Sequence, residues 1–151
     1  MISAKGRYAL RSMLDLALNG SEGNIKLKDI AERQDVPIKF LEQIISVLNK
    51  AGYVKGERGP TGGYRLAFSP EEYTVGMIIR LVEKESAPVA CLSDEGGCKN
   101  SDKCVSMILW RKLDDAVNSV LDGTTLADMM DWSSKGQRIE IMLPEVSDIN
   151  R

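Results

Sequence analysis

The chain carries three cysteines in one short stretch, Cys91, Cys98 and Cys104, with six and five residues between them. An odd number of thiols is a poor basis for structural disulfides, and we expect a cytoplasmic protein, in which thiols stay reduced. Thiolates are preferred ligands of iron–sulfur clusters and zinc. The residue types therefore predict a metal centre, although the spacing matches neither the close Cys-x-x-Cys pairs of zinc ribbons nor the cysteine runs of ferredoxins.

Histidine is absent from all 151 residues. This removes the usual nitrogen ligand of a metal site, and it also removes any Cys–His or Ser–His catalytic pair. An enzyme therefore has little support in the sequence, and we expect a binding function.

A segment before the cysteines has the pattern of a DNA-reading helix. It runs from Pro37 to Lys50, with proline in the first turn and Gly52 just past the end. Apolar residues at helical spacing predict a buried stripe of Leu41, Ile44, Ile45 and Leu48. The residues left facing outward near the N-terminal end, which a helix-turn-helix presents to base edges, are Lys39, Glu42, Gln43 and Ser46.

A glycine-rich hairpin follows this helix directly. Two strand-like runs, Tyr53–Glu57 and Tyr64–Ala67, flank the turn Arg58-Gly59-Pro60-Thr61-Gly62-Gly63. Glycine allows positive φ and proline fixes a corner, so the turn predicts a hairpin tip. Arg58 at this tip can approach phosphates or a narrow minor groove. An ordinary hairpin with a solvated arginine is the alternative, but helix and hairpin together favour a winged DNA-binding domain.

The formal net charge of −2 is low for a DNA-binding protein, but the charge is unevenly distributed. Residues 1–65 carry eleven Lys and Arg against seven Asp and Glu, whereas residues 66–151 carry nine against fifteen. A basic N-terminal half can neutralise phosphates while the acidic half faces away. No stretch approaches the ~18 apolar residues of a membrane helix, so no membrane contact is expected.

The whole pattern predicts a mainly α protein with a small β wing. Further helices are expected at Lys5–Asn19, capped by Ser3, at Lys26–Gln34, and at Val75–Glu83, capped by Thr74. In the first of these, the residues expected to face inward are Tyr8, Leu10, Met13, Leu14, Ala17 and Leu18. We divide the chain into a winged helix-turn-helix domain (1–83), a cysteine-containing loop (84–103), a dimerisation helix with a short terminal helix (104–132), and a tail expected to be disordered (133–151). The short terminal helix is expected to be capped by Thr124 or Thr125 and to end at Met130.

A long apolar helix is expected from Cys104 to Leu121. Its apolar residues recur every three or four positions, at Val105, Ile108, Leu109, Leu113, Ala116, Val117, Val120 and Leu121. Because a three-helix winged domain already closes its own core, we predict that this stripe packs on a second copy in a homodimer. Such a dimer would read a palindromic site. The alternative is a helix folded back on its own domain.

Several motifs resemble the family of winged-helix transcriptional regulators typified by IscR, NsrR and CymR. Ser3–Ala9 is similar to the family's N-terminal signature, Phe40–Gln43 to its recognition helix, and Arg58–Tyr64 to its wing. The segments that resemble the IscR branch in particular are Gly96-Gly97-Cys98, Asp102-Lys103-Cys104 and Leu109-Trp110. The resemblance extends to about Trp132.

The resemblance implies a homodimeric transcription factor, a repressor or a dual regulator, that binds double-stranded DNA and senses iron–sulfur or redox status. The residues implied at the DNA are Lys5, Arg7, Lys39, Phe40, Glu42, Gln43, Ser46, Arg58, Gly59, Thr61, Gly62 and Tyr64. Glu42 would tune which promoter class is bound, and Arg58 would enter the minor groove. Cys91, Cys98 and Cys104 would ligate an iron–sulfur cluster, of the 2Fe–2S type by similarity.

The resemblance leaves the fourth cluster ligand unassigned. The histidine of the IscR branch corresponds to Met107, and the aspartate that NsrR-like members supply from the other subunit corresponds to Tyr8. The candidates for the fourth position are Met107, Ser106, Glu95, Asp102 or a small exogenous ligand. A cluster held by three thiolates should be labile, which suits a sensor.

Two alternative functions remain open. A clusterless repressor controlled by a partner protein, as in the CymR branch, would keep the DNA-binding surface without the metal. An electron carrier would use the cluster for redox reactions, but it would have no use for a wing and a recognition helix.

Overall fold

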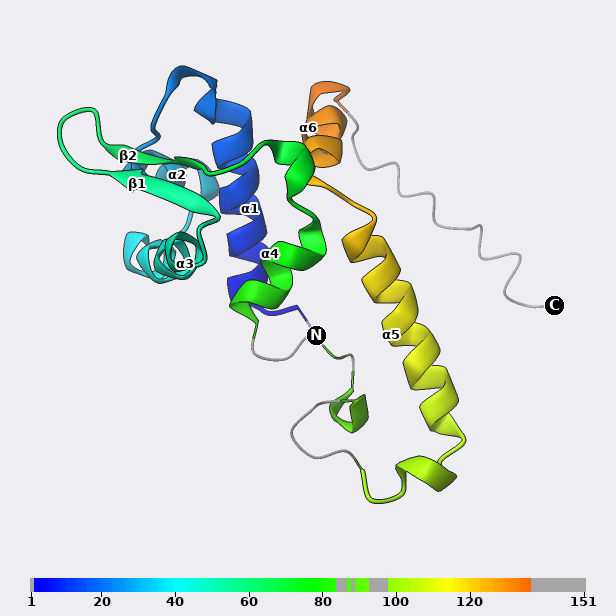
Figure 1. The fold of residues 1–151 in the computed structure, drawn as a ribbon. Helices are drawn as coiled ribbons and strands as arrows, with labels where there is room; N and C mark the ends of the chain where they lie inside the picture. The colour runs from blue at the N-terminus through cyan, green and yellow to red at the C-terminus, as the bar shows by residue number, and fades with distance from the viewer. Residues whose placement is uncertain (1, 84–86, 88, 93–97, 137–151) are drawn as a thin grey trace.

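The computed structural model describes residues 2–83, 87, 89–92 and 98–136. Its α-helices are Ala4–Asn19 (α1), Leu27–Gln34 (α2), Ile38–Lys50 (α3), Val75–Val82 (α4), Ser106–Asp122 (α5) and Leu126–Ser134 (α6). Its strands are Val54–Glu57 (β1) and Gly63–Leu66 (β2), and its 3-10 turns are Gly20–Glu22 (η1), Pro70–Glu72 (η2), Ala90–Leu92 (η3) and Ser101–Lys103 (η4). The mainly helical class with a small β wing is confirmed, and Figure 1 shows how α5 extends away from the other helices.

Helix α1 lies at the centre of the domain and contacts α2, α3, α4, α6 and β2. Ser3 caps it as predicted, because the Gly6 N–H donates to the Ser3 hydroxyl at 3.3 Å. The predicted inward face was partly wrong: Leu18 is 42% exposed, whereas Leu16 is buried. The buried face of α1 consists of Gly6, Ala9, Ser12, Met13, Asp15 and Leu16. Gly6, Ala9 and Ser12 are small, so the surrounding elements can approach the helix closely there.

The turn between α2 and α3 gives the helix-turn-helix its shape. Asp35 adopts a left-handed conformation with φ of 49°, and its N–H donates to the carbonyl of Glu32. Val36 then enters the core. The predicted stripe of α3 is confirmed, because its buried residues are Leu41, Ile44, Ile45 and Leu48.

The wing is an antiparallel pair in which Val54 faces Leu66 and Glu57 faces Gly63. A third segment joins it, since Ile25 and Tyr64 exchange two backbone hydrogen bonds of 2.8 Å. Gly63 has a φ of 145°, and a Cβ there would lie 2.4 Å from the Ile25 carbonyl oxygen. Glycine is therefore required where the wing meets the strand-like segment before α2.

The C-terminal helices differ in their limits from the sequence prediction. Helix α5 begins at Ser106 and not at Cys104, because η4 ends on an extended Cys104. Helix α6 is longer than predicted: Thr125 caps it in a reciprocal pair with Asp128, and it continues to Ser134, where an ion pair of 2.5 Å joins Asp131 and Lys135. Ser133 and Ser134 therefore belong to a helix, and residues 137–151 of the predicted tail lie outside the described residues.

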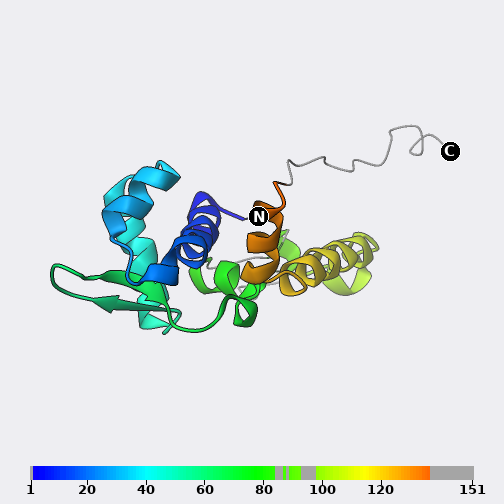
Figure 2. The same cartoon turned by 90° about the horizontal axis from the view of Figure 1, so that it is seen from above.

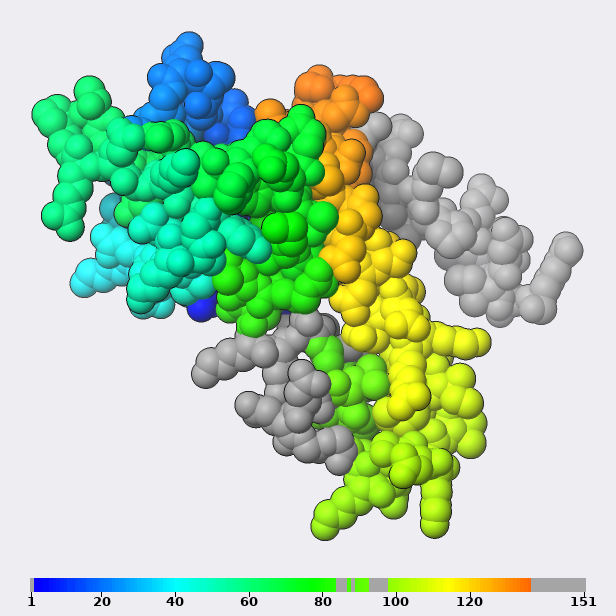
Figure 3. Space-filling view, in the orientation of Figure 1, coloured from blue at the N-terminus to red at the C-terminus, as the bar shows by residue number. Residues whose placement is uncertain are grey.

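Helix α5 forms an arm beside the winged domain (Figures 2 and 3). Met107 is its one buried residue among those described, and the predicted dimer stripe is open to solvent. Exposed fractions in this stripe reach 82% for Val105 and 67% for Val120. The described residues thus leave the apolar face of α5 uncovered. None of the described helices is both long and apolar enough to span a membrane.

Candidate DNA-binding surface and cysteine segment

The outward face of α3 carries the four polar residues that the sequence predicts there. Lys39, Glu42, Gln43 and Ser46 are all exposed, and together they line one shallow hollow of about 570 Å³. Lysine and glutamine donate, while glutamate accepts, so the set can pair with base edges and phosphates. Their exposure is the arrangement that the prediction of a DNA-reading helix requires.

Phe40 supports this face from behind. The structure shows its ring half-buried, packed on the core and edge-on to Tyr8 of α1 at 5.8 Å between ring centroids. The guanidinium of Arg11 in turn lies 5.3 Å from the centre of the Tyr8 ring. The ring contact joins α3 to α1 and so helps to fix the rotation of α3, while the cation–π contact lies within α1 and holds the Tyr8 ring. Phe40 therefore has a structural role, whereas the polar residues near it on α3, such as Lys39 and Glu42, are exposed to solvent.

The buried carboxylate of Asp15 holds α1 against the end of α2. Asp15 is 3% exposed, and both of its oxygens accept from Arg33, at 3.0 and 2.7 Å. Gln34 donates a third hydrogen bond to Asp15 at 2.8 Å, and Arg11 donates to the Gln34 carbonyl at 2.8 Å. A buried carboxylate with this many donors is satisfied and geometrically specific. The network fixes the helix end that leads into the turn before α3.

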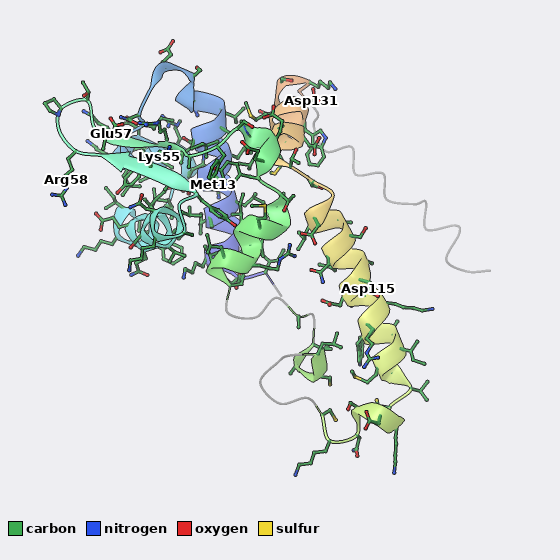
Figure 4. All side chains as sticks on the ribbon, viewed as in Figure 1. Met13, Lys55, Glu57, Arg58, Asp115 and Asp131 are labelled. Atoms are coloured by element: carbon green, nitrogen blue, oxygen red, sulfur yellow. The ribbon has the colours of Figure 1, made fainter. Side chains whose placement is uncertain are left out.

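Arg58 lies on the loop at the outer end of the wing, away from the body of the domain (Figure 4). It is exposed, and it forms no ion pair with the described residues. Gly59 at the same tip has a φ of 106°, and the Gly62 N–H closes the turn on the Gly59 carbonyl at 2.9 Å. A Cβ at Gly62 would lie 2.4 Å from the Glu57 carbonyl oxygen. Gly62 is buried and shapes the tip, and Arg58 is the charged side chain that the tip presents.

The base of the wing is held by a polar cluster of Glu57, Arg65 and Asn24. Arg65 pairs with Glu57, and Asn24 donates to the same carboxylate at 2.8 Å. These hydrogen bonds, that of Arg65 first, lower the pKa of the Glu57 carboxyl below its usual value. Tyr64 lies beside this cluster with its ring against Gly56, where a side chain would be 2.8 Å away. Glu57 and Arg65 neutralise each other, which leaves Lys55 and Arg58 as the wing's free cations among the described residues.

The first helix and the wing tip carry the remaining residues predicted at the DNA. Arg7 is exposed and Lys5 is half-buried, in the first turn of α1, and neither forms an ion pair with the described residues. Thr61 is exposed on the wing tip. Their charges and exposure are compatible with phosphate contacts.

The three cysteines belong to the segment that precedes α5, and the turns η3 and η4 of this segment lie at the end of the molecule away from the wing (Figure 1). Cys91 is half-buried in η3, which contacts α5, while Cys98 and Cys104 are exposed. All three thiols are free of disulfides. Met107, at the position of the missing histidine, is buried in the first turn of α5. Glu95 lies outside the described residues.

The donor set fits three positions of an iron–sulfur cluster. Three free thiols within fourteen residues supply soft ligands, and two of them are open to solvent. In the parts of the chain that the structure describes, however, no three Cys, Asp or Glu side chains are already close enough together to hold a metal ion. Cluster binding would therefore have to draw the three cysteines together.

The match to a family model decides the identity of the chain. The model for Rrf2, described as an iron-dependent transcriptional regulator, matches residues 2–132. The chain belongs to the Rrf2 family. This Rrf2 protein is a DNA-binding transcriptional regulator and not an enzyme, as the sequence predicts.

Individual relatives agree with this assignment. The transcriptional regulator IscR of Aliivibrio salmonicida (strain LFI1238) is 44% identical over 129 residues, which cover 85% of this chain and 76% of that protein. The structure of T. potens IscR matches with a TM-score of 0.74 and 40% identity, over 91% of this chain and 90% of that chain. The structure of CymR, the global cysteine regulator of B. subtilis, matches with a TM-score of 0.72 and 42% identity, over 87% of this chain and 97% of that chain.

Sequence reasoning on this Rrf2 regulator missed the ion pair between the buried Asp15 and the exposed Arg33. One signal was present: Asp15 stands between Leu14 and Leu16 in the apolar part of the first helix, where an unpaired carboxylate would be costly. Its partner lies eighteen residues away on another helix, so the pairing itself could not be read from local spacing.

Proposed function

We propose that this Rrf2 regulator binds palindromic DNA as a homodimer, and that an iron–sulfur cluster on Cys91, Cys98 and Cys104 sets its DNA affinity. The observation that carries the sensor assignment is the concentration of three free thiols next to an uncovered apolar helix. The likeness to IscR regulators supports the same assignment. The expected output is repression, with a dual role as repressor and activator as the alternative.

The dimer assignment rests on the apolar stripe of α5. Val105, Ile108, Leu109, Leu113, Val117 and Val120 are between 36% and 82% exposed in the single chain, and Ala116 lies among them, also exposed. A contiguous apolar helix face of this size is rarely left in water. A second copy of α5 packed along it would bury the stripe on both chains by the same contacts. Two recognition helices would then be related by a two-fold axis, as a palindromic site requires.

Each protomer would read one half-site with two elements. The outward face of α3 would enter the major groove, where Gln43 and Glu42 can reach base edges and Lys39 and Ser46 can reach base edges or phosphates. The wing would place Arg58 at the neighbouring backbone or minor groove. A carboxylate accepts from cytosine but repels phosphate, so Glu42 would restrict the set of promoters bound.

A bound cluster would supply a reversible cross-link between the cysteines that is sensitive to iron, oxygen and redox state. The chain's own contribution is to hold three thiolates in a segment that joins α4 to α5. Since α5 would carry the dimer contacts, a cluster bound to this segment would bias the arrangement of the two DNA-binding domains. The size of that effect is limited by the difference in cluster affinity between the two arrangements.

A clusterless regulator controlled by a partner protein is the second candidate. It is favoured by the likeness to CymR and by Met107, a weak ligand, at the position where a histidine would complete the site. In this case the DNA surface and the dimer would be the same, and the cysteines would stay unligated.

The deciding experiment is iron and sulfide analysis of anaerobically reconstituted protein, with the visible absorbance spectrum. The sensor predicts stoichiometric iron and sulfide, and loss of the absorbance in each of Cys91→Ala, Cys98→Ala and Cys104→Ala. Ser101→Ala, in the same segment, is the matched control and should keep the spectrum. Iron at background in the wild type, with DNA binding intact, would establish the clusterless regulator.

A further inference from the structure

Arg80 connects the DNA-binding domain to the arm. It lies on α4, pairs with Asp122 of α5, and donates to the Asn118 side-chain oxygen at 3.3 Å. Asn118 and Asp122 are four residues apart, so they lie one turn apart on the same face of α5. A single arginine of α4 thus holds two consecutive turns of the helix that carries the dimer stripe.

The surface of α4 is shaped for this contact. Gly76 is buried, and a Cβ built there would lie 2.1 Å from Asp122 Oδ1 and 2.6 Å from Arg80 Nη2. The carboxylate and the guanidinium therefore occupy the space that a side chain at position 76 would fill. The absence of that side chain lets α5 approach α4 closely at this point.

A second anchor fixes the C-terminal end of α5. The Val75 N–H donates to the Thr124 carbonyl at 2.8 Å, and the Leu126 N–H donates to the Tyr73 carbonyl at 3.0 Å. Leu126 is fully buried in the domain core. The backbone junction fixes where α5 ends, and Arg80 fixes the direction in which it leaves.

A small rotation of α5 at Arg80 produces a larger displacement at the far end of the helix. Beyond Asn118 it extends twelve residues to Ser106, or roughly 18 Å, so a tilt of about 10° would displace its far end by roughly 3 Å. One base-pair step of DNA is about 3.4 Å. A small change of direction at Arg80 is therefore large enough to alter the register between two half-sites.

We propose that Arg80 is a positioning residue for DNA recognition: by fixing the angle between α4 and α5, it sets the half-site spacing that the dimer accepts. The proposal rests on the proposed homodimer. The pair of Arg80 and Asp122 is substantially exposed, at 40% and 49% of the side chains, and exposed pairs contribute little to stability. Its role is therefore to set geometry, and the predicted effect falls on spacing preference.

The test compares Arg80→Ala with the wild type on three DNA fragments. One carries the palindrome footprinted in the promoter of the protein's own gene, and the others carry that palindrome with one base pair inserted or removed at its centre. The wild type should prefer the natural spacing by about tenfold or more, and Arg80→Ala should reduce this preference to about threefold or less. Asp122→Ala should have the same effect, and the double variant no larger one.

Lys112→Ala, which removes an exposed cation from the same helix, is the matched control and should keep the wild-type preference. Sedimentation and thermal melting of Arg80→Ala should match the wild type, because neither the α5 stripe nor the core is changed. A dimeric Arg80→Ala protein with the wild-type spacing preference overturns the assignment of Arg80. A monomeric wild type instead overturns the proposed dimer, and this inference with it.

Discussion

Glu83 ties the end of α4 to the beginning of α1 through Ser3: its Oε1 accepts from the Ser3 N–H at 2.8 Å and from the Ser3 hydroxyl at 2.7 Å. The carboxylate thereby lies at the N-terminus of α1, where a negative charge is favoured. A Cβ at Gly6 would be 2.3 Å from the same oxygen, so the helix start is shaped around Glu83. Residues 84–86, which follow Glu83 toward the cysteines, lie outside the described residues.

Glu83→Ala should lower the free energy of unfolding by about 1 kcal/mol, because the first turn of α1 loses its acceptor and its favourable charge. Glu83→Gln keeps an acceptor without the charge, so its free energy of unfolding should lie between those of Glu83→Ala and the wild type. Urea denaturation measures the differences, with Glu71→Ala, an exposed glutamate of η2, as the control. Equal stability of Glu83→Ala and wild type would show that this contact does not stabilise α1.

Arg58→Ala should weaken binding to all DNA sequences by a similar factor. The wing tip would lose a charge that meets the backbone or minor groove, so the slope of log K against log salt should become shallower by about one. Fluorescence anisotropy on the promoter of the protein's own gene and on unrelated DNA, at several salt concentrations, measures both quantities. An unchanged affinity and an unchanged slope would remove the wing from the DNA interface.

Gln43→Ala should give the opposite pattern. Loss of a base-edge contact should cost about 1–3 kcal/mol on the cognate site and little on unrelated DNA, with the salt slope preserved. The same anisotropy series on single base-pair variants of the half-site identifies the position that Gln43 reads. A uniform loss on every sequence would instead make Gln43 a backbone contact.

Leu113→Asp should convert the protein to a monomer. Leu113 lies in the middle of the exposed stripe of α5, so its replacement would put a charge into the dimer seam without disturbing the core of the chain. Sedimentation at micromolar concentration should show the monomer, and affinity for the palindrome should collapse. Lys112→Ala is the neighbouring control and should stay dimeric. A monomeric wild type would contradict the dimer.

Tyr73 gives the domain a predictable response to alkaline pH. Its buried hydroxyl donates to the Tyr53 carbonyl at 2.7 Å and accepts from the Phe68 N–H at 2.9 Å, and burial raises its pKa above the usual value of 10.0. Because the folded pKa is the higher one, the stabilising contribution is complete below pH 10.0 and is lost as the pH rises through the folded value.

Tyr73→Phe should therefore cost about 1–3 kcal/mol at pH 7, since a buried donor and acceptor lose their partner. The difference in free energy of unfolding between Tyr73→Phe and the wild type should become smaller above pH 10. Urea denaturation at both pH values tests this, with Tyr64→Phe as the control, because its hydroxyl has no hydrogen bond to the described residues. A difference that stays constant with pH would exclude Tyr73 as the titrating group.

The recognition helix and the wing could be predicted because their signals are local. The spacing of Leu41, Ile44, Ile45 and Leu48 fixes one face of α3, and the glycines of the wing tip fix a turn, whatever the rest of the chain does. The same locality made the exposure of Lys39 and Gln43 predictable.

The features that the sequence missed depend on contacts between distant segments. The inward face of α1 is chosen by the five elements that surround it, so small residues such as Ala9 are buried while Leu18 is not. The predicted start of α5 was two residues early, because the apolar period continues through Val105 while the backbone at Cys104 is extended. Likewise, the contact of Arg80 with Asp122 joins residues far apart in sequence and has no local signature.

The most direct test of the cluster-controlled regulator is the DNA affinity of one anaerobic preparation before and after its cluster is removed by a chelator. The promoter fragment, the salt concentration and the protein concentration are kept the same. The affinity should change by about tenfold or more, corresponding to about 1.4 kcal/mol of coupling. The variant with all three cysteines replaced by alanine should bind like the stripped protein and should not respond. Equal affinity of the cluster-loaded and stripped protein would contradict the account.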